Sequence, residues 1–470
     1  MAKVTSKLSE TRFLRYSGHR YMDVKELLIR EIIGFLNENA EYAVLRNYEQ
    51  LPVGNDARDI DIIIRRRDFR LLRRRLVGLI DGLGWKILTC LDSDRLVTFV
   101  CARIDEDGSV ALVQWDFFFD TSVWGIRLMS ADEFLADRQF NGFLWHSGPS
   151  SKFLDKYLYD RAVGAQYPER YRAVREAAEN LPSVKAKLAE IFRCPDAVTC
   201  DRAPRNVLML NAFRWNLVHR PFALMGEMTR WAWSYMHNYL GPGTGFAIGF
   251  TGPDGAGKTT VIDMVIDRLG DVFRKAHSYY HFRPALFGNL GDVAHKAGVK
   301  KEVDRNYNDP HRGGRTSPIS SLARLSYYTI DYIVGYWVKV KSQTRITRLV
   351  VFDRYFNDII CDPRRSRIYL PYRFLDMWRK LFIPQLRYNI LLTASTDTIL
   401  QRKRELSRED IEAINARIDL LAPQRGYLKV VNDSTPDVAV NQILTHIFDK
   451  QHRLNLRRLK HSLKLNDDNI

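Results

Sequence analysis

Cysteine is scarce in this chain. Its 470 residues include five cysteines, an odd number with no paired short spacing. Cys194 and Cys200 have no Cys or His pair beside them that would complete a zinc site. The pattern argues against a disulfide framework and favours reduced cysteines in a cytoplasmic protein. The five are Cys90, Cys101, Cys194, Cys200 and Cys361.

Long apolar runs are also missing. The most apolar stretch, Pro318 to Val340, carries Arg324, Asp331 and several tyrosines, so we expect no bilayer span there. The first sixteen residues lack an apolar core segment, which disfavours a secretory signal. Their basic, hydroxyl-rich character leaves a transit peptide as the alternative. Together these features predict a cytoplasmic location.

Acidic residues are too few to balance the basic ones. Asp and Glu total 55 against 72 Lys and Arg, which gives a formal charge of +17. Such an excess indicates anionic partners: nucleotides, phosphorylated substrates, nucleic acid or a membrane surface. The basic residues are scattered along the chain, and no nucleic-acid reader motif is recognisable. Nucleic-acid binding therefore stays open without specific support.

The length suits two or three units. Helix and strand patterns predict an α/β protein with a mixed α/β unit over 20–130, a helical region over 131–240 and a parallel-sheet unit over 246–450. Asp23 should cap a helix that reaches Ala40. A glycine-rich linker is expected at 241–245, and a short helix or disorder at 451–470.

The segment from Arg214 to Leu240 mixes Trp, Met and Arg. Such a segment could lie on a membrane surface, or it could pack in the core between the helical region and the C-terminal sheet. Glu227 and the lack of a clean Lys/Arg face favour core packing. Peripheral membrane contact is left as the alternative.

An apolar run that begins at Phe246 leads into the octapeptide GPDGAGKT, Gly252 to Thr259. This octapeptide fits the phosphate-loop pattern G-x-x-x-x-G-K-S/T at every fixed position, and helical periodicity follows. Backbone N–H groups of such a loop wrap phosphates, a solvent-facing Lys258 can reach them, and the Thr259 hydroxyl can ligate Mg²⁺. We therefore predict an ATP–Mg²⁺ site formed by Gly252, Asp254, Gly255, Ala256, Gly257, Lys258, Thr259 and Thr260.

A later apolar run, LVVFDRY, ends in Asp353 and Arg354. Ligands of open α/β sheets lie at the carboxyl ends of strands, so this end should face the phosphate loop. With the basic stretch after residues 391–400, these segments resemble the thymidylate kinase family over about 246–450. The resemblance implies a phosphate-loop kinase fold and a nucleoside monophosphate kinase-like phosphotransferase. By the same analogy the chain would form a homodimer, although the sequence leaves the oligomeric state open.

The resemblance implies roles for the matching residues. Asp353 would serve the metal, as would Thr259, or would orient the acceptor. Asp254 would approach the sugar of the acceptor, and Arg354 would grip its phosphate bidentately. Arg283, in a segment that loosely resembles the Arg-Glu-Pro segment of the family, is assigned to the acceptor phosphate as well.

Phosphoryl transfer needs positive charge around the moving group. Some thymidylate kinases carry an arginine within the phosphate loop, where this chain has Gly255. The charge is then expected from the lid, where the candidates are Arg402, Lys403, Arg404 and Arg408.

The acceptor side departs from the family. The residues that help to recognise thymine are replaced by a stretch that contains Arg364, Arg365 and Arg367. These arginines favour an acceptor with additional anionic groups over dTMP. We assign Arg364 and Arg365 to acceptor binding.

Carboxylates form a second constellation near the N-terminus. Asp59 and Asp61 share one face of a strand because side chains alternate, and Asp116 lies in another apolar run. Three convergent carboxylates are typical of a two-metal site for nucleotidyl transfer. Residues 42–119 resemble nucleotidyltransferase-like proteins encoded beside bacterial surface-glycan genes, and Arg46-Asn47 replaces their usual Gly-Ser pair.

Two functions from different classes fit these patterns. The first is an ATP-dependent phosphotransferase, fused to a nucleotidyltransferase-like unit, that acts on a nucleoside monophosphate, a sugar phosphate or a lipid-linked intermediate. Family analogy places it in bacterial glycan or envelope assembly. The second is a nucleotide-sensing or nucleic-acid-associated ATPase module, for example in defence.

Overall fold

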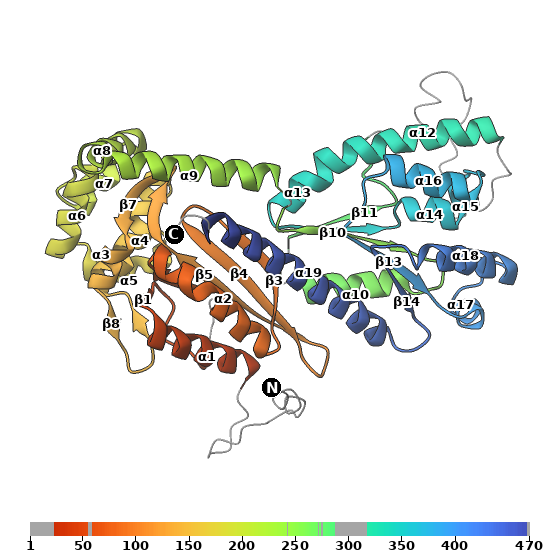
Figure 1. Cartoon of the computed structure of the whole chain (residues 1–470), viewed down its shortest axis with the longest axis horizontal. Coiled ribbons are helices and arrows are strands. Elements are labelled where there is room, and N and C mark those ends of the chain that lie inside the picture. The colour runs from red at the N-terminus through yellow and green to blue at the C-terminus, as the bar shows by residue number, and fades with distance from the viewer. Residues whose placement is uncertain are drawn as a thin grey trace, which may run out of the picture.

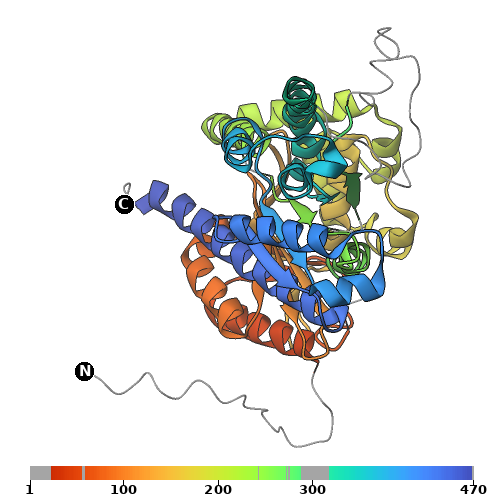
Figure 2. The same ribbon diagram turned by 90° about the vertical axis from the view of Figure 1, so that its right-hand side faces the viewer.

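The structure is a computed structural model of the chain and describes residues 23–54, 59–241, 243–270, 272–273, 276–286 and 317–467, with side chains up to 459. It is a mixed α/β protein built on a seven-stranded and a five-stranded sheet, with helices around both (Figures 1 and 2). The N-terminal segment, assessed above for targeting signals, lies outside the described residues, as does Pro242 of the expected linker.

The seven-stranded sheet has the order β3-β4-β5-β2-β1-β9-β8, and β2 pairs with β5 in parallel. Alternation along β2 sends Ile62 into one core and Ile63 into the core on the opposite face. The strands are β1 (Tyr42–Val44), β2 (Asp59–Ile64), β3 (Lys86–Asp92), β4 (Leu96–Ile104), β5 (Val110–Phe118), β8 (Gln139–Phe140) and β9 (Trp145–His146), beside a hairpin of β6 (Asp120–Val123) and β7 (Ile126–Ser130).

Two helices cover one face of this sheet: α1 (Val24–Asn39) and α2 (Arg66–Gly82). The side chain of Asp23 caps α1 by accepting from the Lys25 N–H, which confirms the expected start of this helix. The opposite face packs against a helical layer. Its members are α3 (Ala131–Ala136), α4 (Pro149–Val163), α5 (Arg172–Ala178), α6 (Pro182–Phe192), α7 (Ala197–Arg202) and α8 (Arg205–His219), with a 3₁₀ turn at Glu169–Tyr171.

The second sheet is parallel throughout, as expected, with the order β11-β12-β10-β13-β14. Its strands are β10 (Phe246–Thr251), β11 (His277–His281), β12 (Leu349–Asp353), β13 (Tyr388–Thr393) and β14 (Tyr427–Val431). One face packs against α10 (Lys258–Gly270) and α19 (Pro436–Asp467). The other carries α12 (Pro318–Gly335), η2 (Tyr336–Lys341), α13 (Ser342–Arg345), α14 (Phe356–Cys361), α15 (Pro363–Ser366), α16 (Tyr372–Phe382), α17 (Thr396–Arg402) and α18 (Arg408–Leu421).

Helix α19 joins the two sheets. Leu88 and Val100 of the first sheet share one hydrophobic core with Ile248 of the second, and α19 lies along both (Figures 1 and 2). Near the end of the helix, Asn455 Nδ2 donates to the Ile87 carbonyl at 2.9 Å, and Leu459 enters the core of the first sheet. Of the two expectations from residue 451, helix is confirmed up to Asp467, where the stretch is the end of the longer α19 and not a short helix of its own.

Helix α9 (Pro221–Leu240) does not pack as expected. Leu224 is the one buried residue along its length, so core packing between the helical region and the C-terminal sheet is wrong for most of it. Within the described part of the chain, no helix combines the length and the hydropathy that crossing a membrane requires. All five cysteines are buried and unpaired, as their spacing predicts.

Candidate functional site

The phosphate loop runs from the end of β10 to the start of α10. Gly255 and Gly257 have φ angles of 89° and 84°, in the left-handed region that favours glycine. A Cβ atom at Gly252 would meet the Leu392 carbonyl at 2.0 Å, and one at Gly257 would meet Asn432 at 2.5 Å. The glycines are therefore needed both for the turn and for its close packing against β13 and the end of β14.

Lys258 folds back onto this loop. Its ammonium donates to the carbonyls of Gly252 at 2.9 Å and Pro253 at 2.7 Å. Only 7% of the residue is exposed, so the expectation of a solvent-facing lysine is wrong for this conformation. Burial, and next the positive charge of Arg354, lower the pKa of Lys258 to about 8, although Asp254 opposes the shift. Phosphate oxygens would have to replace the two carbonyls as its partners.

Asp353 ends β12 at the same edge of the sheet, since Phe250 of β10 is its register partner. One carboxylate oxygen, Oδ2, accepts from Tyr279 at 2.9 Å and lies 3.3 Å from His281 Nδ1. The other, Oδ1, is buried without a hydrogen-bond partner among the described residues. Burial alone would raise the pKa of Asp353, but the contact with His281 and the charges of Arg354 and Lys258 lower it to about 2. A buried, ionised carboxylate with a free oxygen suits a cation.

Arg354 follows directly and adopts a φ of 74°, which is uncommon outside glycine. The guanidinium is buried and donates to the carboxylates of Asp254 and Asp358. Arg365 Nη2 also lies 3.1 Å from Asp254 Oδ2, and Lys258 Nζ lies 3.7 Å from Asp254 Oδ1. The structure therefore brings four predicted site residues together around the loop.

The other predicted arginines lie in different surroundings, and not all of them are near the phosphate loop. Arg364 is exposed and pairs with Asp410, away from the carboxylate of Asp254. Arg283 is buried, where its Nη1 donates to Asp331 of α12 at 2.9 Å. Arg402 lies beside the phosphate loop and donates to the Asn432 carbonyl at 2.8 Å.

The remaining lid candidates also differ in position. Lys403 borders Gly255, and Arg404 is exposed nearby. Arg408 is exposed and pairs with Asp397. Two of the four lid candidates, Arg402 and Lys403, therefore border the phosphate loop.

Sequence reasoning missed several groups of this site. Asp358 lies one helical turn after Arg354, a spacing that predicts an ion pair on a helix. Tyr279 and His281 alternate along β11 and so share one face of the strand. Asn432, whose Nδ2 donates to the Ala256 carbonyl at 2.9 Å, follows β14 and carries no local signal.

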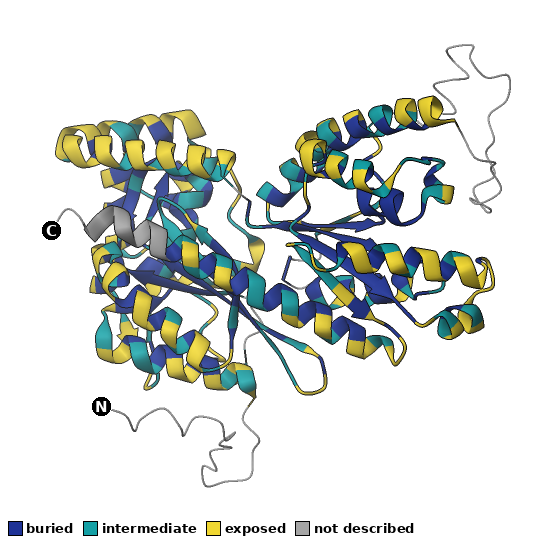
Figure 3. Ribbon diagram, turned by 45° about the vertical axis from the view of Figure 1, so that its right-hand side comes forward, coloured by how far each residue is buried: buried dark blue, intermediate teal, exposed yellow. Residues whose placement is uncertain are grey.

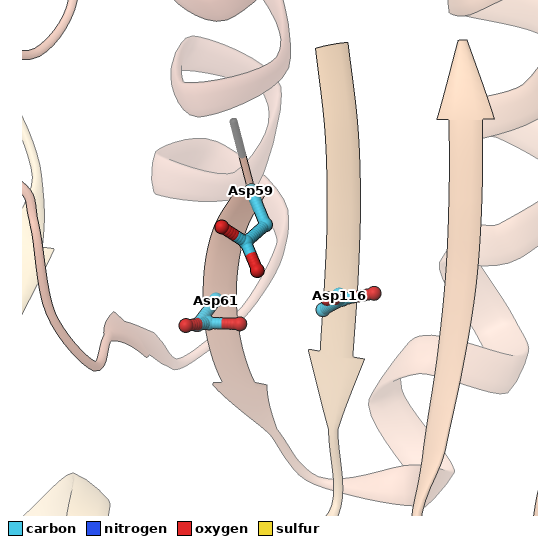
Figure 4. Close-up of side chains that lie close together, drawn as sticks. All are labelled: Asp59, Asp61 and Asp116. Atoms are coloured by element: carbon cyan, nitrogen blue, oxygen red, sulfur yellow. The ribbon is translucent and has the colours of Figure 1, made fainter. Parts of the chain in front are cut away.

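The N-terminal carboxylates converge as predicted. Asp61 of β2 is the register partner of Asp116 on β5, and Asp59 lies two residues earlier on the same face. One oxygen from each lies within 4.8 Å of the others (Figure 4). Asp116 also accepts from Gln114 Nε2 at 2.9 Å and from the Thr98 hydroxyl. Three carboxylates at this separation could hold a divalent cation.

Arg46 contacts this cluster. Its Nε donates to Asp61 at 2.7 Å, and its Nη1 donates to Asp155 of α4 at 3.0 Å. Burial raises the pKa of Asp61 to about 7; Arg46 opposes the shift, and the charges of Asp116 and Asp59 add to it. The guanidinium of Arg46 therefore places a fixed positive charge beside the three carboxylates.

The C-terminal sheet and the glycine loop between β10 and α10 define the class: an α/β protein with a parallel sheet and a phosphate-loop motif. Neither a protein-family model nor a curated protein matches the sequence. Among solved structures, a thymidylate kinase from Ehrlichia chaffeensis is similar at 15% identity and a TM-score of 0.29, over 44% of this chain and 99% of that one.

Proposed function

We propose that the C-terminal half is an ATP-dependent phosphotransferase whose acceptor already carries a phosphate. The observation that supports this most is the convergence of Lys258, Arg354 and Arg365 on the single carboxylate of Asp254. With Asp353 and Asp358 close by, three carboxylates balance these three cations. Phosphate groups of the nucleotide and the acceptor would compete with Asp254 for them, because Arg and Lys bind phosphate oxygens strongly.

The loop would hold the nucleotide. Its backbone N–H groups and the start of α10 would cradle the phosphates, and Lys258 would contact the β/γ-phosphates. Thr259 and Asp353 would hold Mg²⁺, whose charge would offset that of the phosphates. The unpartnered, buried Oδ1 of Asp353 fits this role.

Catalysis of phosphoryl transfer depends mostly on positioning the reactants and stabilising charge. The remaining residues would therefore orient the acceptor and stabilise the charge of the transferred phosphoryl group. Arg354 would hold the acceptor phosphate while Asp358 keeps the guanidinium in place. Arg402 and its neighbours in the lid, Lys403 and Arg404, would add charge beside the moving group. Arg365, next to Asp254, would meet a further anionic group of a nucleoside monophosphate, sugar phosphate or lipid-linked acceptor.

A transfer assay tests this proposal. Radiolabelled ATP is incubated with a panel of nucleoside monophosphates and sugar phosphates, and label is expected in a phosphorylated product with wild-type protein but not with Lys258→Ala. Wild-type activity in Lys258→Ala would refute the assignment. ATP hydrolysis without any labelled product, stimulated by random DNA and suppressed steeply by salt, would instead favour the nucleic-acid-associated ATPase.

The carboxylate cluster favours a second candidate activity for the N-terminal half, metal-dependent nucleotidyl transfer. Asp59, Asp61 and Asp116 would hold Mg²⁺ for it. The double variant Asp59→Asn, Asp61→Asn should abolish Mg²⁺-dependent nucleotide incorporation, whereas Asp132→Asn, an exposed carboxylate on α3, should not change it. Incorporation that survives in the double variant would contradict this candidate.

A further inference from the structure

Helix α9 exposes an unusual amount of apolar surface. Phe222 is 89% exposed and Trp233 is 66% exposed. Large apolar side chains recur on the outer side of this helix at Phe222, Met225, Met228, Trp233, Tyr235, Met236, Tyr239 and Leu240. Scattered exposed apolar residues are ordinary, but a continuous series on one helix marks a binding surface.

Helix α12 and its continuation η2 expose a second apolar series. Its exposed members recur at helical spacing: Ile319, Leu322, Ile330, Val334, Trp337 and Val338. Arg324 and Asp331 are the two charged residues of α12. Asp331 is fully buried against Arg283, and Arg324 is half-buried. The outer stripe of α12 therefore carries no exposed carboxylate.

The two apolar series meet. The guanidinium of Arg345, on α13, lies 4.5 Å from the ring centre of Tyr239, at the end of α9. Lys341 Nζ donates to the Gly241 carbonyl at 3.2 Å. Figures 1 and 2 show α9, α13 and α12 along the same side of the molecule, and Figure 3 shows exposed residues on both long helices. We refer to the exposed apolar residues of α9, α12 and η2 as the apolar ridge.

The two chain segments that carry the apolar ridge are mostly basic, although Asp94 and Asp120 lie beside Glu227 and Arg230 of α9. Residues 204–240 and 317–348 hold two carboxylates, Glu227 and Asp331, and both are paired with arginines. The same segments hold nine basic residues: Arg205, Arg214, Arg220, Arg230, Arg324, Lys339, Lys341, Arg345 and Arg348. A second copy docked face to face would bring like charges together. An anionic lipid surface would accept the apolar side chains and neutralise the basic ones.

We propose that the apolar ridge binds the surface of an anionic membrane, with α9 and α12 lying in the interface. Trp, Tyr and Met suit the boundary between the lipid headgroups and the hydrocarbon, because their side chains tolerate contact with both water and lipid. The ridge lies outside the phosphate-loop site, so membrane binding does not depend on the proposed function. If that function also holds, the buried pair Arg283–Asp331 connects the membrane-facing α12 to the strand end after β11, which suits an acceptor held at the lipid surface.

Vesicle sedimentation tests the proposal. The full chain is mixed with vesicles of phosphatidylcholine alone or of equal parts phosphatidylcholine and phosphatidylglycerol, at low and high salt. Binding is expected to the anionic vesicles and should weaken with salt. Trp233→Glu and Trp337→Glu should each lower the partition coefficient about tenfold or more, because each removes one aromatic side chain that would insert into the lipid surface. Leu420→Glu, on the exposed side of α18, is the matched control and should bind as wild type, as should Lys258→Ala.

Three outcomes would overturn the proposal. The first is no sedimentation with the anionic vesicles, and the second is equal binding by wild type, Trp233→Glu and Trp337→Glu. The third is a dimer in light scattering that both glutamate variants convert to a monomer, which would make a second copy the occupant of the apolar ridge. Circular dichroism of the two variants should match wild type, because both tryptophans are exposed.

Discussion

Arg354, at the end of β12, forms an ion pair with Asp254 of the phosphate loop. The same carboxylate lies 3.7 Å from the ammonium of Lys258. The two cations that the sequence assigns to separate phosphates therefore share one anion. Asp254 therefore helps to hold both cations in place in this conformation.

Replacing Arg354 tests its assignment to the acceptor. Arg354→Lys keeps the charge but loses the planar, two-pronged donor, and we expect kcat/KM for the acceptor to fall about a hundredfold. Binding of a fluorescent ATP analogue should change little. Arg373→Lys, at an exposed arginine of α16, is the matched control and should retain normal transfer. Equal losses in the two variants would contradict the role of Arg354.

Asp353→Asn removes the ionised oxygen proposed for the metal. We expect kcat to fall at least about a hundredfold and the Mg²⁺ requirement to shift to higher concentration, as calorimetric titration with Mg²⁺–ATP would show. Tyr279→Phe keeps the carboxylate and removes one hydrogen bond, so its effect should be near 1 kcal/mol at most. An Asn variant with unchanged Mg²⁺ dependence would contradict the assignment.

Arg46→Met tests whether the guanidinium substitutes for a cation at the N-terminal carboxylates. Breaking its pairs with Asp61 and Asp155 should destabilise the fold by roughly 3 kcal/mol, because both acids are largely buried. Mg²⁺ or Mn²⁺ should then raise the melting temperature of the variant more than that of wild type. Arg65→Met, which breaks exposed pairs with Glu41 and Asp132, should show a small loss and no rescue by metal.

His452 lies at the contact between the halves and should make the stability of the fold depend on pH. Its Nδ1 accepts from the Ile87 N–H at 3.1 Å, and its Nε2 lies 3.1 Å from Asp81. Burial lowers the pKa of His452 below its usual 6.5, with Lys86 adding to the shift while Asp81 opposes it. A lowered histidine pKa means that the unfolded chain binds the extra proton, so stability is full above pH 6.5 and declines below it.

Thermal melts across this range measure the effect. His452→Gln removes the titrating ring but keeps an acceptor for Ile87, so its melting temperature should fall less steeply below pH 6.5. Parallel curves for wild type and variant would show that His452 does not carry this dependence.

Local patterns predicted much of the architecture. The helix capped by Asp23, the parallel C-terminal sheet and the glycine loop all depend on residues within one segment, so their signals survive in the sequence. The packing of helix α9 could not be predicted, because an apolar helix face has the same sequence pattern whether it contacts protein or another surface. The packing of the end of α19 could not be predicted, because its partner, β3, lies more than 300 residues away in the chain.

In the candidate sites, too, residues within one segment could be predicted, and contacts between distant segments could not. Lys258, Asp353 and the Asp59–Asp61 pair lie in motifs, and Asp116 could be added because it sits on a second apolar strand. Their partners could not be found this way. Arg46 reaches Asp61 only because β1 and β2 are neighbours, and Tyr279 reaches Asp353 only because β11 pairs with β12.

Helix α19 has a consequence for how this protein can be divided. The other half of the chain buries three residues of the N-terminal sheet, Leu88, Val100 and Ala102. The Ile87 N–H donates to the His452 ring of α19, and the Leu88 carbonyl accepts from the Gln451 side chain of the same helix. A gene fragment that encodes either half alone would produce a polypeptide with an uncovered, aggregation-prone strip. We therefore expect each half to fold poorly without the other.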